Sequence, residues 1–254
     1  MEFKIAVIGD HMYGDRTVLT DGIPDEVQDV MSNTPSNTPS KGYYDEELNS
    51  LIKGKGQDKK LPNPIVITQR NGQQVLTFNS YKQLAEEYLL LLGTAHECVV
   101  EEDKNKNLIY QGPSPDEITL VDAAKNMGYV YRRSDNQFIY LQIMGREERF
   151  ELLSVHPFSS ERKRMSVIIR HNGLIKMYVK GVILLIIQAD SIVKARTAPN
   201  QPYMGVLDSY LNTFSVKGLR TLLVGMKVLS QGEYDAFRDA EAKLPEEGRS
   251  KQRE

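Results

Sequence analysis

The second half of the chain alternates apolar and polar residues with the period of β-strands. From Tyr129 onward, four such segments follow one another: YVYR, QFIYLQI, RFELLSV and RMSVIIR. Asn172-Gly173 predicts a two-residue hairpin turn into a fifth strand, LIKMYVK, and RTLLVGMKV predicts another. Because connections this short join antiparallel neighbours, the pattern predicts a mostly antiparallel sheet.

Helices are predicted where apolar residues recur at helical spacing between capping residues. The clearest is SPDEITLVDAAKNMG, with Ser114 as N-cap, Pro115 at the first helical position and Gly128 just past the end. Further helices are predicted at 80–95, 183–190, 203–218 and 230–243, and short strands at EFKIAVIG, 66–68 and NLIYQ. We therefore expect one α+β domain over residues 1–254, with an antiparallel sheet of about six or seven strands and helices packed against it.

The tract from 31 to 60 interrupts this order. It contains a duplicated SNTP unit followed by many Gly and Lys residues. Such a composition buries too little apolar surface to offset the entropy of ordering, so most of 31–60 is expected to be a mobile, low-complexity insertion. The acidic stretch 44–52 is compatible with one or two helical turns.

Composition narrows the classes of function. The chain has 254 residues, a formal charge of -2 and a pI near 6.2, so no global field attracts nucleic acid or anionic membranes. The single cysteine, Cys98, fits a reducing compartment, and four scattered histidines offer no metal-ligand spacing. Because its apolar runs are far shorter than the roughly 20 residues of a membrane helix, we expect a soluble piece of chain.

Phosphate-binding loops are also missing from the sequence. GDHMYGD lacks the lysine and hydroxyl of G-x-x-x-x-G-K-[ST], and no G-x-G-x-x-G occurs. The stretch HPFSSERKRMSV, residues 156–167, instead places an aromatic ring beside three cations. Three interpretations stay open for it: a strand with a solvated charged end, a nucleic-acid patch at Arg162–Arg164, or a pocket where the ring of Phe158 stacks on a flat ligand.

Four separate segments favour the third interpretation. In chain order, SPDEITL, PFSSERKRMSV, YVKG and KGLRTL resemble the segments SSPDEAALV, FSSDRKRMSV, KGAD and EGLRTL. Those belong to the nucleotide-binding domain of P-type ATPases, specifically the type IV subfamily that flips phospholipids. MEFKIAVIG and LLLGTAHECVVEE also resemble parts of that domain. The resemblance covers essentially the full chain, with the SNTP tract as an insertion.

The resemblance implies a set of ATP-binding residues. Phe158 would stack on adenine, Ser160 would donate a hydrogen bond nearby, and Lys163 and Lys180 would line the pocket. Gly181 follows Lys180 in the same motif.

At the phosphates, Arg220 would act as a planar fork. Glu117 would approach adenine, although a glutamate three residues after Ser114 also completes a capping box without any ligand. Arg162 and Arg164 are expected to be surface charges that point away from the pocket.

One segment departs from the family pattern. The sequence reads KGVILL where the family has KGAD, so Val182 and Ile183 replace an alanine and an acid. The missing aspartate would cap the following helix, which is therefore expected to start differently.

The implied function is that of the cytosolic ATP-binding domain of a larger membrane pump. The DKTGT phosphorylation loop, the Mg²⁺-binding acids and the membrane helices of that family are not in this sequence. ATP is therefore the expected ligand, with Mg²⁺ bound outside this part of the chain. The expected partners are the phosphorylation and actuator domains, a phospholipid bound by membrane helices, and an accessory subunit of the parent. No nucleic acid is expected.

Two alternatives remain. One is a divergent regulatory or interaction domain that kept the fold but lost nucleotide binding, as KGVILL makes conceivable. The other is a nucleic-acid module built on Arg162–Arg164, whose affinity would fall steeply with salt.

Overall fold

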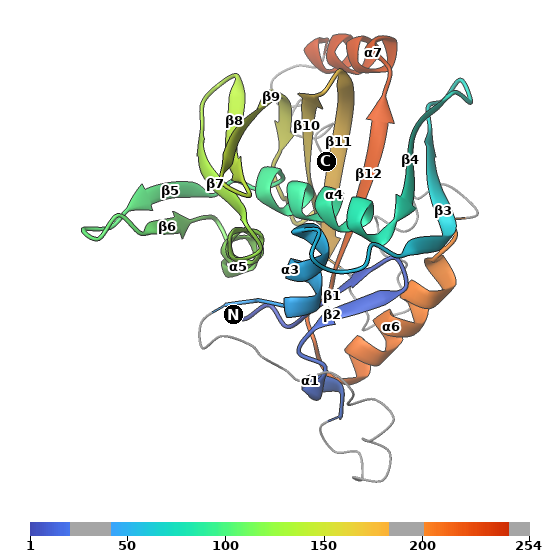
Figure 1. The fold of residues 1–254 in the computed structure, drawn as a ribbon. Coiled ribbons are helices and arrows are strands. Elements are labelled where there is room, and N and C mark those ends of the chain that lie inside the picture. Colours follow the sequence, from blue (N-terminus) through green and yellow to red (C-terminus); the bar gives the residue numbers. More distant parts are fainter. Residues whose placement is uncertain (21–41, 183–200, 244–254) are drawn as a thin grey trace.

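A six-stranded antiparallel sheet forms the centre of the molecule (Figure 1). The computed structural model describes residues 1–20, 42–182 and 201–243. The strands follow the order β12-β11-β10-β9-β8-β7, and each is hydrogen-bonded to its neighbour in sequence. Their bounds are β7 Tyr129–Ser134, β8 Phe138–Ile143, β9 Arg146–His156, β10 Arg164–His171, β11 Leu174–Val182 and β12 Leu222–Leu229. The predicted α+β class with a mostly antiparallel sheet is therefore confirmed.

Three two-stranded sheets and several helices surround this sheet. The small sheets pair β1 Ile5–Ile8 with β2 His11–Gly14, β3 Lys60–Thr68 with β4 Gln74–Ser80, and β5 Val99–Glu102 with β6 Leu108–Gln111. The helices are α1 Thr17–Thr20, α3 Glu46–Ile52, α4 Tyr81–Thr94, α5 Pro115–Asn126, α6 Met204–Val216 and α7 Gln231–Ala242. None of the helices in the described ranges combines the length and apolar character that a membrane crossing requires.

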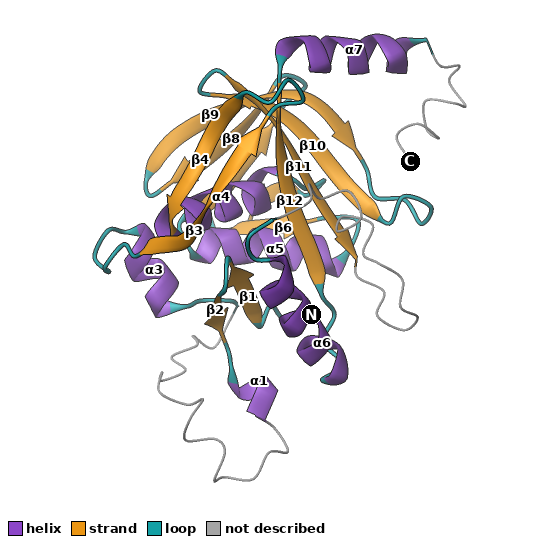
Figure 2. Ribbon diagram, turned by 90° about the vertical axis from the view of Figure 1, so that its right-hand side faces the viewer, coloured by secondary structure: helices purple, strands orange, loops and turns teal. Residues whose placement is uncertain are grey.

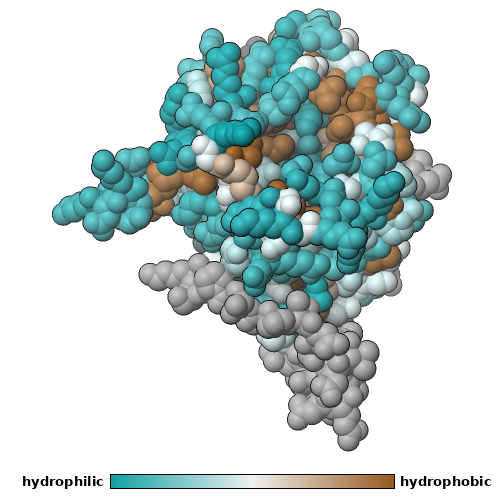
Figure 3. All heavy atoms as spheres, in the orientation of Figure 1, coloured by the Kyte–Doolittle hydropathy of each residue, from teal (hydrophilic) through white to brown (hydrophobic). Residues whose placement is uncertain are grey.

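Helices α4 and α5 lie side by side against one face of the large sheet (Figure 2). The main core lies between these helices and the sheet, and it contains fully buried Leu89, Val121, Leu141, Phe150 and Tyr178. On the other face of the sheet, Ile168 and Ile175 form a smaller cluster with Tyr234 of α7. The hairpin of β5 and β6 projects from the body, and apolar surface is visible where it leaves (Figures 1 and 3).

Local signals in the sequence explain several element ends. Asn172 and Gly173 have φ values of 49° and 76°, the left-handed pair that a type I′ hairpin turn requires. The side chain of Ser114 accepts a hydrogen bond from the backbone N–H of Glu117 at 3.2 Å, and that of Ser230 caps α7 in the same way. At α7 the box is complete, because the Glu233 carboxylate accepts from the Ser230 N–H at 2.9 Å.

The acidic stretch 44–52 was compatible with one or two helical turns, and residues 42–60 bear this out. They include α3, whose apolar side chains join the main core together with Tyr43. Three apolar residues at helical spacing, Leu48, Leu51 and Ile52, are sufficient to anchor this helix despite its polar flanks. Residues 21–41 and the helix predicted at 183–190 lie outside the described residues.

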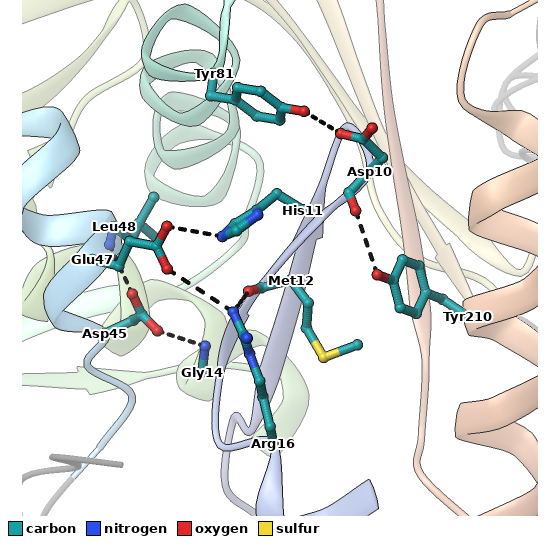
Figure 4. Close-up of polar contacts among 10 residues, drawn as sticks. All are labelled: Asp10, His11, Met12, Gly14, Arg16, Asp45, Glu47, Leu48, Tyr81 and Tyr210. Carbon is teal, nitrogen blue, oxygen red and sulfur yellow. Dashed lines mark hydrogen bonds and ion pairs between the residues drawn. The ribbon is translucent and has the colours of Figure 1, made fainter. Parts of the chain in front are cut away.

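The β1–β2 hairpin is held to α3 by side chains of the acidic stretch (Figure 4). Gly14, at φ 107°, donates its N–H to the Asp45 carboxylate at 2.7 Å. A Cβ there would lie 2.2 Å from the Lys4 carbonyl oxygen, so only glycine fits. His11 Nε2 lies 3.0 Å from a Glu47 carboxylate oxygen. Further hairpin contacts involve Arg16, Tyr81 and Tyr210.

A buried ion pair ties α4 to β11, the second strand of the large sheet. Lys176 of β11 places its ammonium 2.8 and 2.7 Å from the two carboxylate oxygens of Glu87, and the Tyr178 hydroxyl donates to the same carboxylate at 2.5 Å. The side chains of Lys176 and Glu87 are only 8% and 13% exposed. Loss of one partner would leave the other charge buried and unpaired.

We therefore expect Glu87→Gln to lower the free energy of unfolding by about 3 kcal/mol, because the Lys176 ammonium loses its counterion. Chemical denaturation measures the change. The control is Glu86→Gln on the same helix, where the carboxylate is 41% exposed and 3.9 Å from Lys82. That variant should lose less than about 1 kcal/mol. Equal losses in the two variants would contradict the role given to the Lys176–Glu87 pair.

Candidate functional site

The loop between β9 and β10 presents an aromatic ring to solvent. Phe158 is 51% exposed, and it is the only aromatic side chain among the large apolar residues exposed in the described ranges. Arg162, four residues later, is buried at 5% exposure. Its guanidinium donates to the carbonyl oxygens of His156 at 3.1 Å and Pro157 at 2.7 Å, and to the Ser166 hydroxyl at 3.1 Å. Arg162 therefore ties the two residues before Phe158 to the start of β10.

The expectation that Arg162 is a surface charge was wrong. A guanidinium has five N–H donors in a fixed fork, and carbonyl groups of a tight loop supply acceptors that water cannot easily reach. Arg164 is half-buried and donates to the Arg162 carbonyl at 3.0 Å. Arg162–Arg164 is thus no exposed basic run, which removes the basis of the nucleic-acid alternative.

Ser160 and Lys163 lie exposed in the same loop. The turn that carries them is closed by Ser159, whose hydroxyl accepts from Arg162 N at 3.0 Å and whose carbonyl accepts from Lys163 N at 2.8 Å. Lys163 has a φ of 51°, in the left-handed region. Both predicted residues therefore share the loop of Phe158.

Lys180 and Glu117 meet across the face of the sheet. Lys180, near the end of β11, lies 2.7 Å from a carboxylate oxygen of Glu117 in the first turn of α5, and the two side chains are 7% and 9% exposed. Gly181 is also buried and pairs with Arg164 of β10 and Leu223 of β12. Glu117 does not complete a capping box: its second oxygen accepts from the Glu97 N–H at 3.3 Å.

Glu97 connects this pair to Phe158. Burial and the neighbouring Glu117 carboxylate raise the pKa of Glu97, whereas Lys180 and a hydrogen bond from the Phe158 backbone N–H act in the opposite direction. The side chain is half-buried. Glu97, Glu117 and Lys180 thus form a continuous chain of contacts from three separate segments, with the backbone of Phe158 next to Glu97.

His96 lies beneath this cluster as a neutral imidazole. Its Nε2 is 3.0 Å from the Gly93 carbonyl oxygen and its Nδ1 accepts from the Cys98 N–H at 3.1 Å, so the two partners fix one tautomer. Burial, with the nearby Lys180 charge, lowers the pKa of His96 to about 3. Burial and the Glu117 carboxylate raise the pKa of the Cys98 thiol to about 12, so this buried thiol is unreactive near neutral pH.

Arg220 forms the outer part of the site. It follows Gly218, which ends α6 with a φ of 68°, and precedes β12, whose first residues pair with the end of β11 beside Lys180. The Arg220 Nη1 donates to the Asp116 carboxylate at 2.7 Å. Arg220 is 61% exposed and Asp116 is 23% exposed.

The structure therefore connects some of the predicted residues more directly than others. An ion pair joins Glu117 and Lys180, the backbone of Phe158 lies next to Glu97, and Arg220 reaches the same helical turn through Asp116. Sequence analysis missed Asp116 and Glu97. Both could have been noticed, because Asp116 lies within the SPDE segment and Glu97 lies within LLLGTAHECVVEE, two segments that carry the family resemblance. Within the described ranges, no three His, Cys, Asp or Glu side chains gather closely enough to hold a metal ion.

Comparisons with known proteins match this chain to one family. The family model for P-type ATPase, cytoplasmic domain N, matches residues 80–252. The chain is 36% identical over 156 residues to a phospholipid-transporting ATPase of Schizosaccharomyces pombe, covering 61% of this chain and 12% of that protein. It is 35% identical over 150 residues to phospholipid-transporting ATPase IC of Xenopus tropicalis, with coverages of 59% and 11%. It is 34% identical over 159 residues to phospholipid-transporting ATPase DRS2 of Saccharomyces cerevisiae, with coverages of 61% and 11%. The chain thus spans only 11% to 12% of the length of these curated relatives.

We expect Arg162→Lys to lower the free energy of unfolding by about 2 kcal/mol, because an ammonium cannot reach all three acceptors of the guanidinium. Thermal or chemical denaturation provides the value. The matched control is Lys163→Arg, the reverse exchange at the exposed neighbour, which should change stability by no more than about 0.5 kcal/mol. An Arg162→Lys variant as stable as the wild type would show that these three contacts are dispensable.

The neutral His96 predicts a stability that falls with acidity. The unfolded chain takes up a proton at the ordinary His pKa of 6.5 but the folded protein only at about 3, so the unfolded state binds more protons between these values. Lowering the pH from 7 to 5 should therefore cost about 2 kcal/mol through this residue. Denaturation curves of His96→Gln should show a shallower pH dependence, with the remainder from groups such as His171, whose pKa burial also lowers. An unchanged slope would contradict the neutral state of His96.

Proposed function

The chain belongs to the P-type ATPases and corresponds to their cytoplasmic domain N, and on this premise we propose that it binds ATP at the Phe158 loop. One observation carries the proposal: the exposed ring of Phe158 belongs to a loop that Arg162 ties together and that leads into β10, whose first residues pair with Lys180 and Gly181. The ring offers a flat face to adenine, and base stacking of this kind contributes about 1–3 kcal/mol.

The charges around the ring suggest how the rest of the nucleotide lies. Arg220 is exposed and would engage a phosphate, while Lys163 and Ser160 are exposed in the loop of Phe158 and would contact the nucleotide from that side. Lys180 and Gly181 are buried, so they would line the inner wall beside Glu117 rather than reach far along the phosphates. Because no phosphate cradle is present in the sequence, the affinity should be near the millimolar end, ~-4 kcal/mol, and nearly independent of Mg²⁺.

For the whole protein we propose ATP-driven phospholipid transport, as the names of the relatives indicate for those proteins. In this role the domain holds adenosine, and the γ-phosphate faces an aspartate of a phosphorylation domain elsewhere in the parent chain. Phosphoryl transfer depends mainly on position and charge neutralisation, so one domain can hold the nucleotide while another supplies the nucleophile. The actuator domain, the membrane helices that take the phospholipid, and an accessory subunit would complete the cytosol-facing pump.

We expect Phe158→Ala to weaken ATP binding at least about tenfold, because the base loses its stacking surface. NMR titration of the labelled protein with several millimolar ATP measures the affinity and should shift Phe158, Lys180 and Arg220 in the wild type. Phe138→Ala is the control, since that half-buried ring lies on β8 against Arg149, and its affinity should match the wild type. Absence of shifts at the three site residues, or equal weakening in both variants, would overturn the proposed site.

A further inference from the structure

The first turn of α5 supplies a counterion to each cation at the inner and outer ends of the site. Asp116 and Glu117 are consecutive residues at the second and third positions of this helix. Asp116 pairs with Arg220 and Glu117 with Lys180, both at 2.7 Å. The two cations come from different segments, so a single helical turn neutralises charges that the fold brings together from far along the chain.

The two ion pairs differ in their access to solvent. Lys180 and Glu117 are 7% and 9% exposed, whereas Arg220 and Asp116 are 61% and 23% exposed. A phosphate group can reach Arg220 without displacing core side chains. To reach Lys180 it would have to enter the core and leave the Glu117 carboxylate without its counterion, which is costly for a buried charge.

The geometry of the outer pair favours exchange. Asp116 engages one nitrogen of the guanidinium, Nη1. A phosphate can accept two parallel N–H bonds from the same fork, and such bidentate contacts are stronger and more directional than a single bond. The Asp116 carboxylate, in contrast, can be released to water at the surface.

We propose that Asp116 competes with the nucleotide phosphates for Arg220, so that ATP binds by replacing the Asp116 carboxylate while the Glu117–Lys180 pair stays intact. This inference rests on the proposed function, since it assumes that the nucleotide occupies the Phe158 loop. Asp116 is then a specificity-determining residue. A ligand without phosphate cannot displace it, and a phosphorylated ligand binds more weakly than Arg220 alone would allow.

The test compares ATP with adenosine on the full chain by NMR titration. Asp116→Asn should tighten ATP binding about two- to fivefold, the range of exposed ion pairs, and leave adenosine binding unchanged. In an Arg220→Gln background the same substitution should have no effect on ATP affinity. The control is Asp122→Asn on the same helix, whose carboxylate pairs with Lys125 at 2.8 Å and which removes the same charge. It should leave both affinities within about 1.5-fold of the wild type.

The other possible results distinguish failure of the Asp116 competition from failure of the proposed ATP site. Weaker or unchanged ATP binding in Asp116→Asn, with the normal loss in Phe158→Ala, would overturn the competition and leave the proposed site standing. Tightening that persists in the Arg220→Gln background would mean simple charge repulsion and would also overturn it. ATP binding that is insensitive to Phe158→Ala would remove the proposed function, and the competition with it.

Discussion

Burial of two lysines on one strand determines how the helices sit on the sheet. Lys176 and Lys180 project from the same face of β11, and each needs a carboxylate there because a buried ammonium is costly when unpaired. Glu87 of α4 and Glu117 of α5 meet that need. Each helix is therefore fixed in position and rotation by a directional contact, in addition to the non-directional packing of its apolar face. The candidate site follows, because Glu117 and its helical turn are placed by the second pair.

Much of this fold could be read from the sequence, because the signals are local. Ser114 and Pro115 start α5, Asn172-Gly173 forms the turn between β10 and β11, and strand alternation yields the antiparallel sheet. These features depend on residues within one or two turns of each other. They therefore need no knowledge of what packs against them.

Local sequence signals could not predict whether a charged side chain points into the core or toward solvent. Alternate residues of LIKMYVK point to opposite faces of the sheet. Lys176 and Lys180 lie on the same face, and their charge would lead a sequence pattern to assign that face to solvent. Their partners lie 89 and 63 residues away, so only the assembled fold shows that this face is the inner one. Arg162 was misplaced for the same reason, since its acceptors are carbonyl groups that no composition or period reveals. The residues around the candidate nucleotide came from family resemblance rather than from pattern.

The outward-facing ring of Phe158 has a kinetic consequence. Because this ring is already exposed at the surface, no part of the protein has to open before a ligand binds or dissociates. With a dissociation constant near 1 mM and association at about 10⁶ M⁻¹s⁻¹ or faster, the residence time is about a millisecond or less. Enzymes commonly turn over about ten times per second. Under the proposed function, departure of ADP from such a surface would therefore be far from rate-limiting, and larger movements of the parent protein would set its rate.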